Sequence, residues 1–142
     1  MRLSTPWGAA QTIKTLAPGI LLVSTASHGG LMLDSAAVQD LPEHLRTAGE
    51  TYGDWRCFEE DCACGLVYEA RIDLYREHKR QQLSSWEKTL RQPNLPAYVT
   101  QEGPACVERL RSAIAMSDAD LLAPIAADNR RWFPEVFGFR PN

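Results

Sequence analysis

The sequence predicts an α+β fold, in which a small antiparallel sheet of three to four strands packs against helices. Short segments of β-type residues, separated by turn residues, fill residues 10–34. After Glu59 no proline occurs until Pro93, and apolar residues recur at helical spacing. A chain of 142 residues with 44% hydrophobic residues has the size and composition of one domain with its own core. We therefore expect a single domain over residues 1–142, with an α+β core over 1–100 and a helical C-terminal extension over 101–142.

The first part of the chain predicts a β-meander. Residues 10–16 are rich in β-branched side chains, and residues 20–25 form a short apolar run. Pro18 and Gly19 lie between them, and this pair suits the two central positions of a type II turn. Residues 31–34 are expected to form a third strand that places its two leucines on one face.

The middle of the chain predicts short elements. Ser35 is a candidate cap for a helical turn that ends near Gln39. Pro42 suits the first position of another short helix. Residues 49–54 are expected to form a loop, and Trp55–Phe58 the end of a strand.

Helices are predicted from Glu59 onward, and the first is expected to carry acidic residues in its first turn, near the positive end of the helix dipole. A break at Ser84-Ser85 divides the first two helices, which end before Pro93 and Pro96. The remaining expectations are a helix over Pro104–Met116, a helix capped by Ser117 and kept short or kinked by Pro124, and an aromatic tail, Trp132–Phe139, that folds back on the body.

Composition narrows the function classes. The net charge is −3, so the basic surplus typical of general nucleic-acid binding is absent, and we expect no direct nucleic-acid partner. No apolar stretch is long enough for a signal peptide or a membrane span, which favours a cytoplasmic location with reduced cysteines. The spacing Cys57-x4-Cys62-x-Cys64 does not match structural zinc sites, and we expect neither a metal nor a cofactor.

Two segments carry candidate site residues. His28 lies in the segment Ser27-His28-Gly29-Gly30, where two glycines allow another group to approach closely. Paired with Cys62 or Asp61, His28 would form a Cys–His or acid–His pair. It is also interpretable as a turn histidine that binds the N-terminus of the acidic helix, locking its free N–H groups.

The acidic run Glu59-Glu60-Asp61 has three possible interpretations. It could bind a metal or perform acid–base chemistry, it could simply favour a helix start, or it could be a protein-binding patch that imitates nucleic-acid phosphates.

Several motifs together resemble a domain family found in phages, plasmids and integrated elements, alone or attached to long polyvalent proteins with antirestriction modules. The motifs are Thr5-Pro6-Trp7-Gly8, Ser27-His28-Gly29-Gly30 and Glu59-Glu60-Asp61-Cys62, within a resemblance over about residues 4–98. Phe58 stands where the family has a tyrosine, and the aromatic residue that the family has soon after the cysteine is missing.

The resemblance implies counter-defence by binding. On this reading the chain is an anti-CRISPR or antirestriction protein that binds a host defence protein or ribonucleoprotein complex through Trp7, His28, Glu59, Glu60 and Asp61. An alternative is a small hydrolase or transferase that uses His28 with Cys62 or Asp61. A third reading is a structural accessory protein, such as a homodimer.

Overall fold

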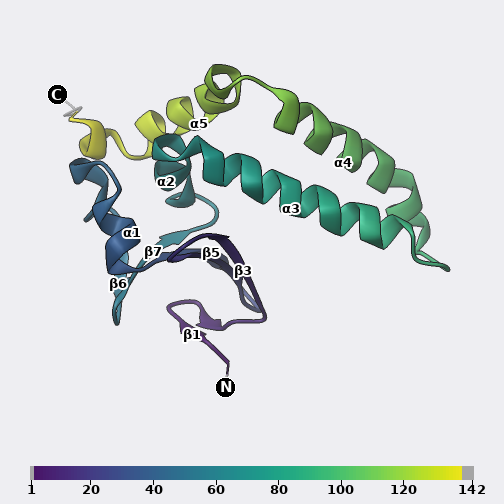
Figure 1. Cartoon of the computed structure of the whole chain (residues 1–142), viewed down its shortest axis with the longest axis horizontal. Helices are drawn as coiled ribbons and strands as arrows, with labels where there is room; N and C mark the ends of the chain where they lie inside the picture. The colour runs from purple at the N-terminus through teal and green to yellow at the C-terminus, as the bar shows by residue number, and fades with distance from the viewer. Residues whose placement is uncertain (1, 139–142) are drawn as a thin grey trace.

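A five-stranded antiparallel sheet forms the centre of the protein. The computed structural model describes residues 2–138, and its strands follow the order β3-β4-β5-β7-β6 (Figure 1). These strands are β3 (Thr12–Ala17), β4 (Ile20–Ser24), β5 (Gly29–Leu33), β6 (Glu50–Tyr52) and β7 (Trp55–Glu59). A separate small hairpin consists of β1 (Ser4–Thr5) and β2 (Gly8–Ala9). The α+β class is confirmed, and the sheet has one strand more than the upper predicted number.

The additional strand is β6, in a segment that the sequence predicted as a loop. Tyr52 pairs with Trp55, so only two residues connect β6 to β7. Gly53, in this turn, has a φ of +58°, a conformation that favours glycine. The predicted loop is therefore a tight β-hairpin at the edge of the sheet.

The predicted meander is confirmed. Gly19 has a φ of +75° in the turn between β3 and β4, as a type II turn requires. Leu31 and Leu33 both enter the main core, on one face of β5. The capping prediction that follows was wrong by one residue: α1 (Ser35–Gln39) is capped by Asp34, whose carboxylate accepts from the Ala37 N–H at 2.9 Å. The short helix predicted after Pro42 is present as the 3-10 helix η1 (Glu43–Leu45).

The second half of the described chain is helical. Its elements are α2 (Cys64–Ala70), α3 (Ile72–Leu90), α4 (Ala97–Ala115), α5 (Asp118–Trp132) and η2 (Pro134–Phe137). Helices α3 and α4 lie side by side and form a long hairpin that extends past the sheet (Figure 1). Helix α5 returns along α2, so the C-terminal part of the described chain closes back on the domain.

The predicted helix start at Glu59 was wrong. Glu59 ends β7, where it pairs with Gly30, and the first helix begins only at Cys64. Acidic residues suit a turn as well as a helix N-terminus, so composition did not distinguish the two. The predicted break at Ser84-Ser85 was also wrong, because both serines lie on the exposed side of a continuous α3. The break occurs at Arg71, which has an extended φ of −133°.

Two prolines lie inside helices, one of which Pro104 was expected to begin and the other of which Pro124 was expected to keep short or kinked. Helix α4 starts at Ala97 and continues through Pro104, and α5 runs for 15 residues through Pro124. A proline removes one helical hydrogen bond, and tertiary packing offsets this loss. In α4, Gly103 sits so close to α3 that an added Cβ would lie 2.7 Å from Leu90 Cδ2. The predicted cap of α5 is confirmed, since Ser117 Oγ accepts from the Asp120 N–H.

The sheet has apolar contacts on both faces. The main core lies between one face and the helices, and its fully buried side chains include Leu31, Leu33, Phe58, Leu66 and Leu74. The opposite face carries a smaller cluster of Val23, Met32 and Cys57, against which Leu3, Trp7 and Trp55 pack. The N-terminal hairpin thus covers the face that the helices leave open.

The C-terminal segment folds back as predicted, within the described residues. Phe133 and Phe137 pack against the main core, and the Phe137 ring lies edge-on to His44 at 5.7 Å between centroids. Trp132 is the exception, because 63% of its surface remains exposed. Phe139, part of the same prediction, lies outside the described residues.

Candidate functional site

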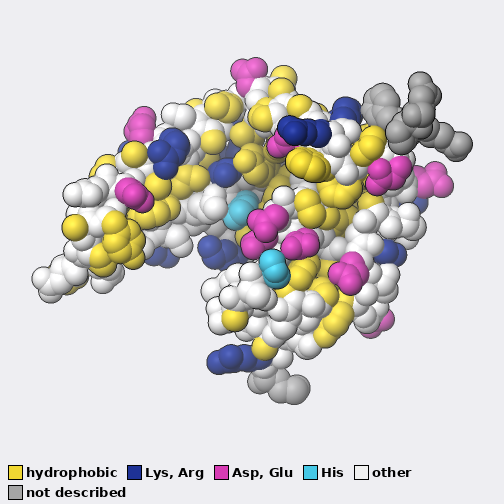
Figure 2. All heavy atoms as spheres, turned by 180° about the vertical axis from the view of Figure 1, so that it is seen from behind, with side chains coloured by type: hydrophobic (Ala, Val, Ile, Leu, Met, Phe, Trp, Pro, Cys, Tyr) yellow, Lys and Arg dark blue, Asp and Glu magenta, His cyan; other side chains and the backbone are white. Residues whose placement is uncertain are grey.

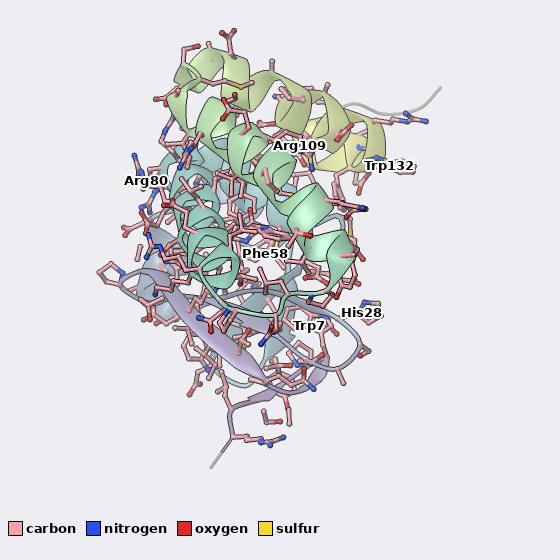
Figure 3. The ribbon with its side chains drawn as sticks, turned by 90° about the vertical axis from the view of Figure 1, so that its right-hand side faces the viewer. Trp7, His28, Phe58, Arg80, Arg109 and Trp132 are labelled. Atoms are coloured by element: carbon pink, nitrogen blue, oxygen red, sulfur yellow. The ribbon has the colours of Figure 1, made fainter. Side chains whose placement is uncertain are left out.

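Three sequence motifs that are far apart in the chain meet at one end of the sheet. Thr25 joins two of them: its hydroxyl lies 3.1 Å from the Trp7 carbonyl oxygen and 2.6 Å from the His28 carbonyl oxygen. Thr5 holds the first motif in shape by donating to the Gly8 carbonyl at 2.7 Å and accepting from the Trp7 N–H at 3.1 Å. Figure 3 shows Trp7 below Phe58 and His28 at the rim of the molecule.

The two glycines of the second motif make this junction possible. A Cβ added at Gly30 would lie 2.2 Å from the Phe58 carbonyl oxygen and 2.7 Å from Trp7 Cη2. A Cβ added at Gly29 would lie 2.4 Å from the Val23 carbonyl oxygen. Both contacts are too short for any side chain, so the predicted close approach is present: backbone and an indole ring occupy the space.

The acidic motif completes the junction. His28 Nδ1 lies 3.5 Å from Glu59 Oε1, and one ligand-type atom each from His28, Glu59 and Asp61 lie within 4.8 Å of one another. The Glu60 N–H donates to the Gly29 carbonyl at 2.9 Å. This bond continues the β5–β7 ladder into the turn. The predicted locking of a helix N-terminus was therefore wrong, because the motif forms a strand end and a turn.

The resulting surface is exposed and acidic. The side chains of His28 and Glu59 are 52% and 39% exposed, and Glu60 and Asp61 are also exposed. Within residues 2–138, no lysine or arginine forms an ion pair with Glu59, Glu60 or Asp61. One imidazole and two carboxylates are a donor set that zinc accepts. Exposed acidic groups are also common without a bound ion, so this arrangement alone does not assign a metal site.

The cysteines separate into two classes. Cys62 is exposed in the turn and belongs to no group of candidate metal ligands among the described residues. Cys64 is buried, and its thiol donates to the Phe58 carbonyl at 3.0 Å. Burial raises the pKa of Cys64 to about 12 and that of Cys57 to about 11. These two thiols therefore stay protonated at neutral pH and act as small buried side chains.

A second polar group, which the sequence did not indicate, lies behind the acidic turn. The Tyr68 hydroxyl and His78 Nδ1 are 3.2 Å apart, joining α2 to α3. Burial, and then the nearby Lys79 and Lys14, lower the pKa of His78 to about 4, while burial raises the pKa of Tyr68. His78 is thus neutral at physiological pH, and which of the two groups donates depends on the tautomer of the imidazole. The two residues are on different helices, so no local spacing pointed to the pair.

The half-buried His78 predicts a specific pH dependence. Between pH 6.5 and about 4 the unfolded chain binds a proton at this position and the folded chain does not, so stability is lost as the pH falls. We expect the wild type to lose about 1–2 kcal/mol more than His78→Gln over this range, a value reduced for partial solvent exposure. Urea unfolding at a series of pH values measures the difference. Parallel curves for the two proteins would contradict the assignment of a neutral His78.

The comparison with protein families identifies the chain. The family model of the domain of unknown function DUF7007 matches residues 1–119. The chain belongs to the DUF7007 family. The matched region contains the three motifs that meet at the end of the sheet, and it includes all of α4. It ends at residue 119, so most of α5 and all of η2 lie outside it. No curated protein and no solved structure is significantly similar to this chain.

The DUF7007 match extends through the α3–α4 hairpin, beyond the residues 4–98 over which the resemblance was noted. The division into a core over 1–100 and a helical extension over 101–142 stays a prediction. Among the described residues, no helix is both long and apolar enough to cross a membrane.

Proposed function

We propose that the protein inhibits a host defence complex, of the CRISPR or restriction type, by binding to it directly. The contact surface is the acidic turn surface, defined as His28, Glu59, Glu60 and Asp61. The observation that carries the proposal is that its three carboxylates are exposed and form no ion pair with a lysine or arginine of the described chain. Figure 2 shows acidic side chains gathered beside a histidine on this side of the molecule.

The mechanism follows from charge and rigidity. Lysines and arginines that hold nucleic-acid phosphates also bind clustered carboxylates, with charge-assisted hydrogen bonds. The turn is fixed by the Glu60–Gly29 hydrogen bond and by the β5–β7 pairing, so little order has to be gained on binding. Trp7 lies beneath the junction and would position the surface. The resemblance to domains that accompany antirestriction modules supports a defence complex as the partner.

Co-purification tests the proposal. Tagged protein is mixed with purified CRISPR effector and restriction complexes, and both retention and residual nuclease activity are measured. We compare Glu59→Gln/Glu60→Gln/Asp61→Asn with a control that removes three acids from the helical hairpin, Glu87→Gln/Glu102→Gln/Glu108→Gln. The wild type and the control should bind and inhibit, and the first variant should lose at least about tenfold in affinity. Full nuclease activity and no retention with every complex would refute the proposal.

A second candidate is an enzyme that acts on the same partners, and the 3.5 Å approach of His28 Nδ1 to Glu59 Oε1 favours it. The two atoms are slightly beyond direct hydrogen-bond reach, and contacts of this kind in ligand-free catalytic sites often tighten when the substrate binds. Titration distinguishes the two mechanisms. A binding inhibitor must be supplied in stoichiometric amounts, whereas a hydrolase or transferase inactivates an excess of target and changes the mass of one of its subunits.

A further inference from the structure

A cleft next to the acidic turn surface combines aromatic rings with carboxylates. It has a volume of about 270 Å³ and lies between the turn after β7, helices α2 and α3, and helix α5. We call it the aromatic cleft and define it by six lining residues: Glu60, Asp61, Tyr75, Asp128, Trp132 and Phe133. Figure 3 places Trp132 and His28 along the same side of the molecule, with Arg80 on the opposite side.

The walls of the cleft are held by polar contacts between α5 and α2. Asn129 is only 3% exposed, and its amide donates to the Gly65 carbonyl at 2.8 Å. Arg130 forms an ion pair with Glu69 at 2.7 Å, one residue further along the same helix. These contacts fix α5 against α2. The cleft is therefore largely formed before any partner arrives, and Trp132 stays exposed at its rim.

The charges in the cleft favour a cation. Glu60, Asp61 and Asp128 supply three carboxylates, against two cations, Lys79 in the lining and Arg131, whose guanidinium lies 5.1 Å from the centre of the Trp132 ring. The chain itself shows that a cation fits the rings here, because Lys79 Nζ lies 4.9 Å from the centre of the Tyr75 ring. His78, also in the lining, adds no charge at neutral pH because its pKa is lowered. The cleft keeps a net negative charge beside aromatic faces.

We propose that the aromatic cleft receives an arginine side chain from the basic surface of a partner protein. A guanidinium group is planar, so it stacks on Trp132 or Phe133 while donating to Asp61 and Asp128. A lysine ammonium is a compact, strongly hydrated charge and gains less from the rings. The inference rests on the proposed function, since it names the side chain through which the defence complex is held.

The test uses blocked hexa-arginine and hexa-lysine peptides with the full chain, at about 150 mM salt to suppress diffuse attraction. NMR titration follows the Trp132 indole N–H and the Asp128 amide. We expect hexa-arginine to shift both signals and to bind at least about threefold more tightly than hexa-lysine. Asp61→Asn/Asp128→Asn should lower the affinity about tenfold, and Glu102→Gln/Glu108→Gln should change it by less than about twofold.

The outcomes separate this inference from the proposed function. Equal affinity for the two peptides, equal losses in both double variants, or shifts spread over the acids of α4 would overturn the cleft assignment. So would a defence complex that binds Asp61→Asn/Asp128→Asn as tightly as it binds the wild type. Conversely, peptide binding in the cleft without capture of any defence complex would keep the arginine site and refute counter-defence. Thermal unfolding of each variant shows whether a loss is due to misfolding.

Discussion

Gly30→Ala is expected to cost about 2–4 kcal/mol of folding stability and to disturb the acidic turn surface. The added methyl group would lie 2.2 Å from the Phe58 carbonyl oxygen, 2.7 Å from Trp7 Cη2 and 3.0 Å from Glu59 Cα. Two of these three atoms belong to the backbone of β7, which is held in the sheet by its pairing with β5. Strand β7 must therefore shift, and the Trp7 ring of the N-terminal hairpin must move as well.

Urea unfolding measures the loss, and Ser27→Ala is the matched control. Ser27 is exposed in the same motif, so its replacement should change the free energy of unfolding by less than about 0.5 kcal/mol. NMR shifts of the Glu59 and Asp61 amides in folded Gly30→Ala report the disturbance of the turn. A variant as stable as Ser27→Ala, with these amides unmoved, would mean that the close approach of β7 to Gly30 is not present in solution.

The elements predicted correctly are those whose determinants are local. Pro18 and Gly19 define a turn by their own backbone preferences, and Leu31 and Leu33, two residues apart on a strand, share one face. Ser117 caps α5 through a bond to a residue three positions later. In each case the deciding interaction lies within a few residues of the chain, so the sequence alone carries the information.

The elements predicted wrongly depend on contacts between distant residues. Glu59 was assigned to a helix because nothing local shows that it pairs with Gly30. Pro104 was expected to begin a helix, but α4 starts earlier, at Ala97, and its packing on α3 offsets the hydrogen bond that Pro104 removes. Propensity is a weak prior, and tertiary contacts decided both cases.

The residues of the candidate site also divide into those that the sequence indicated and those that only distant contacts bring together. The motif residues Trp7, His28 and Glu59 were singled out, and the structure brings them to one junction, although their function stays a prediction. The aromatic cleft was not anticipated. It needs Asp61 from a turn, Tyr75 from α3 and Trp132 from the end of α5, and no spacing rule links residues so far apart.

Phe58→Ala is expected to cost about 3–5 kcal/mol, a large part of the 5–15 kcal/mol that stabilises a typical domain. Phe58 is fully buried, and it pairs with Leu31 at the centre of the sheet. Its ring packs so tightly that a Cβ at Gly49 would lie 2.9 Å from Phe58 Cζ, which leaves little room for the surroundings to collapse into the cavity. Urea unfolding measures the loss.

Two comparisons make this prediction decisive. Tyr98→Ala, at a side chain that is 65% exposed, should change stability by less than about 0.5 kcal/mol, and Phe58→Leu should lose less than Phe58→Ala because it keeps more of the buried volume. Phe58 does not line the aromatic cleft, so folded Phe58→Ala at low temperature should still bind hexa-arginine within about twofold of the wild type. A stability loss below about 1 kcal/mol would show that Phe58 is not at the centre of the core. A loss of peptide binding by the folded variant would show instead that the acidic turn takes its shape from the core beneath it. The link is the Phe58 carbonyl, which accepts a hydrogen bond from the Cys64 thiol at the start of α2.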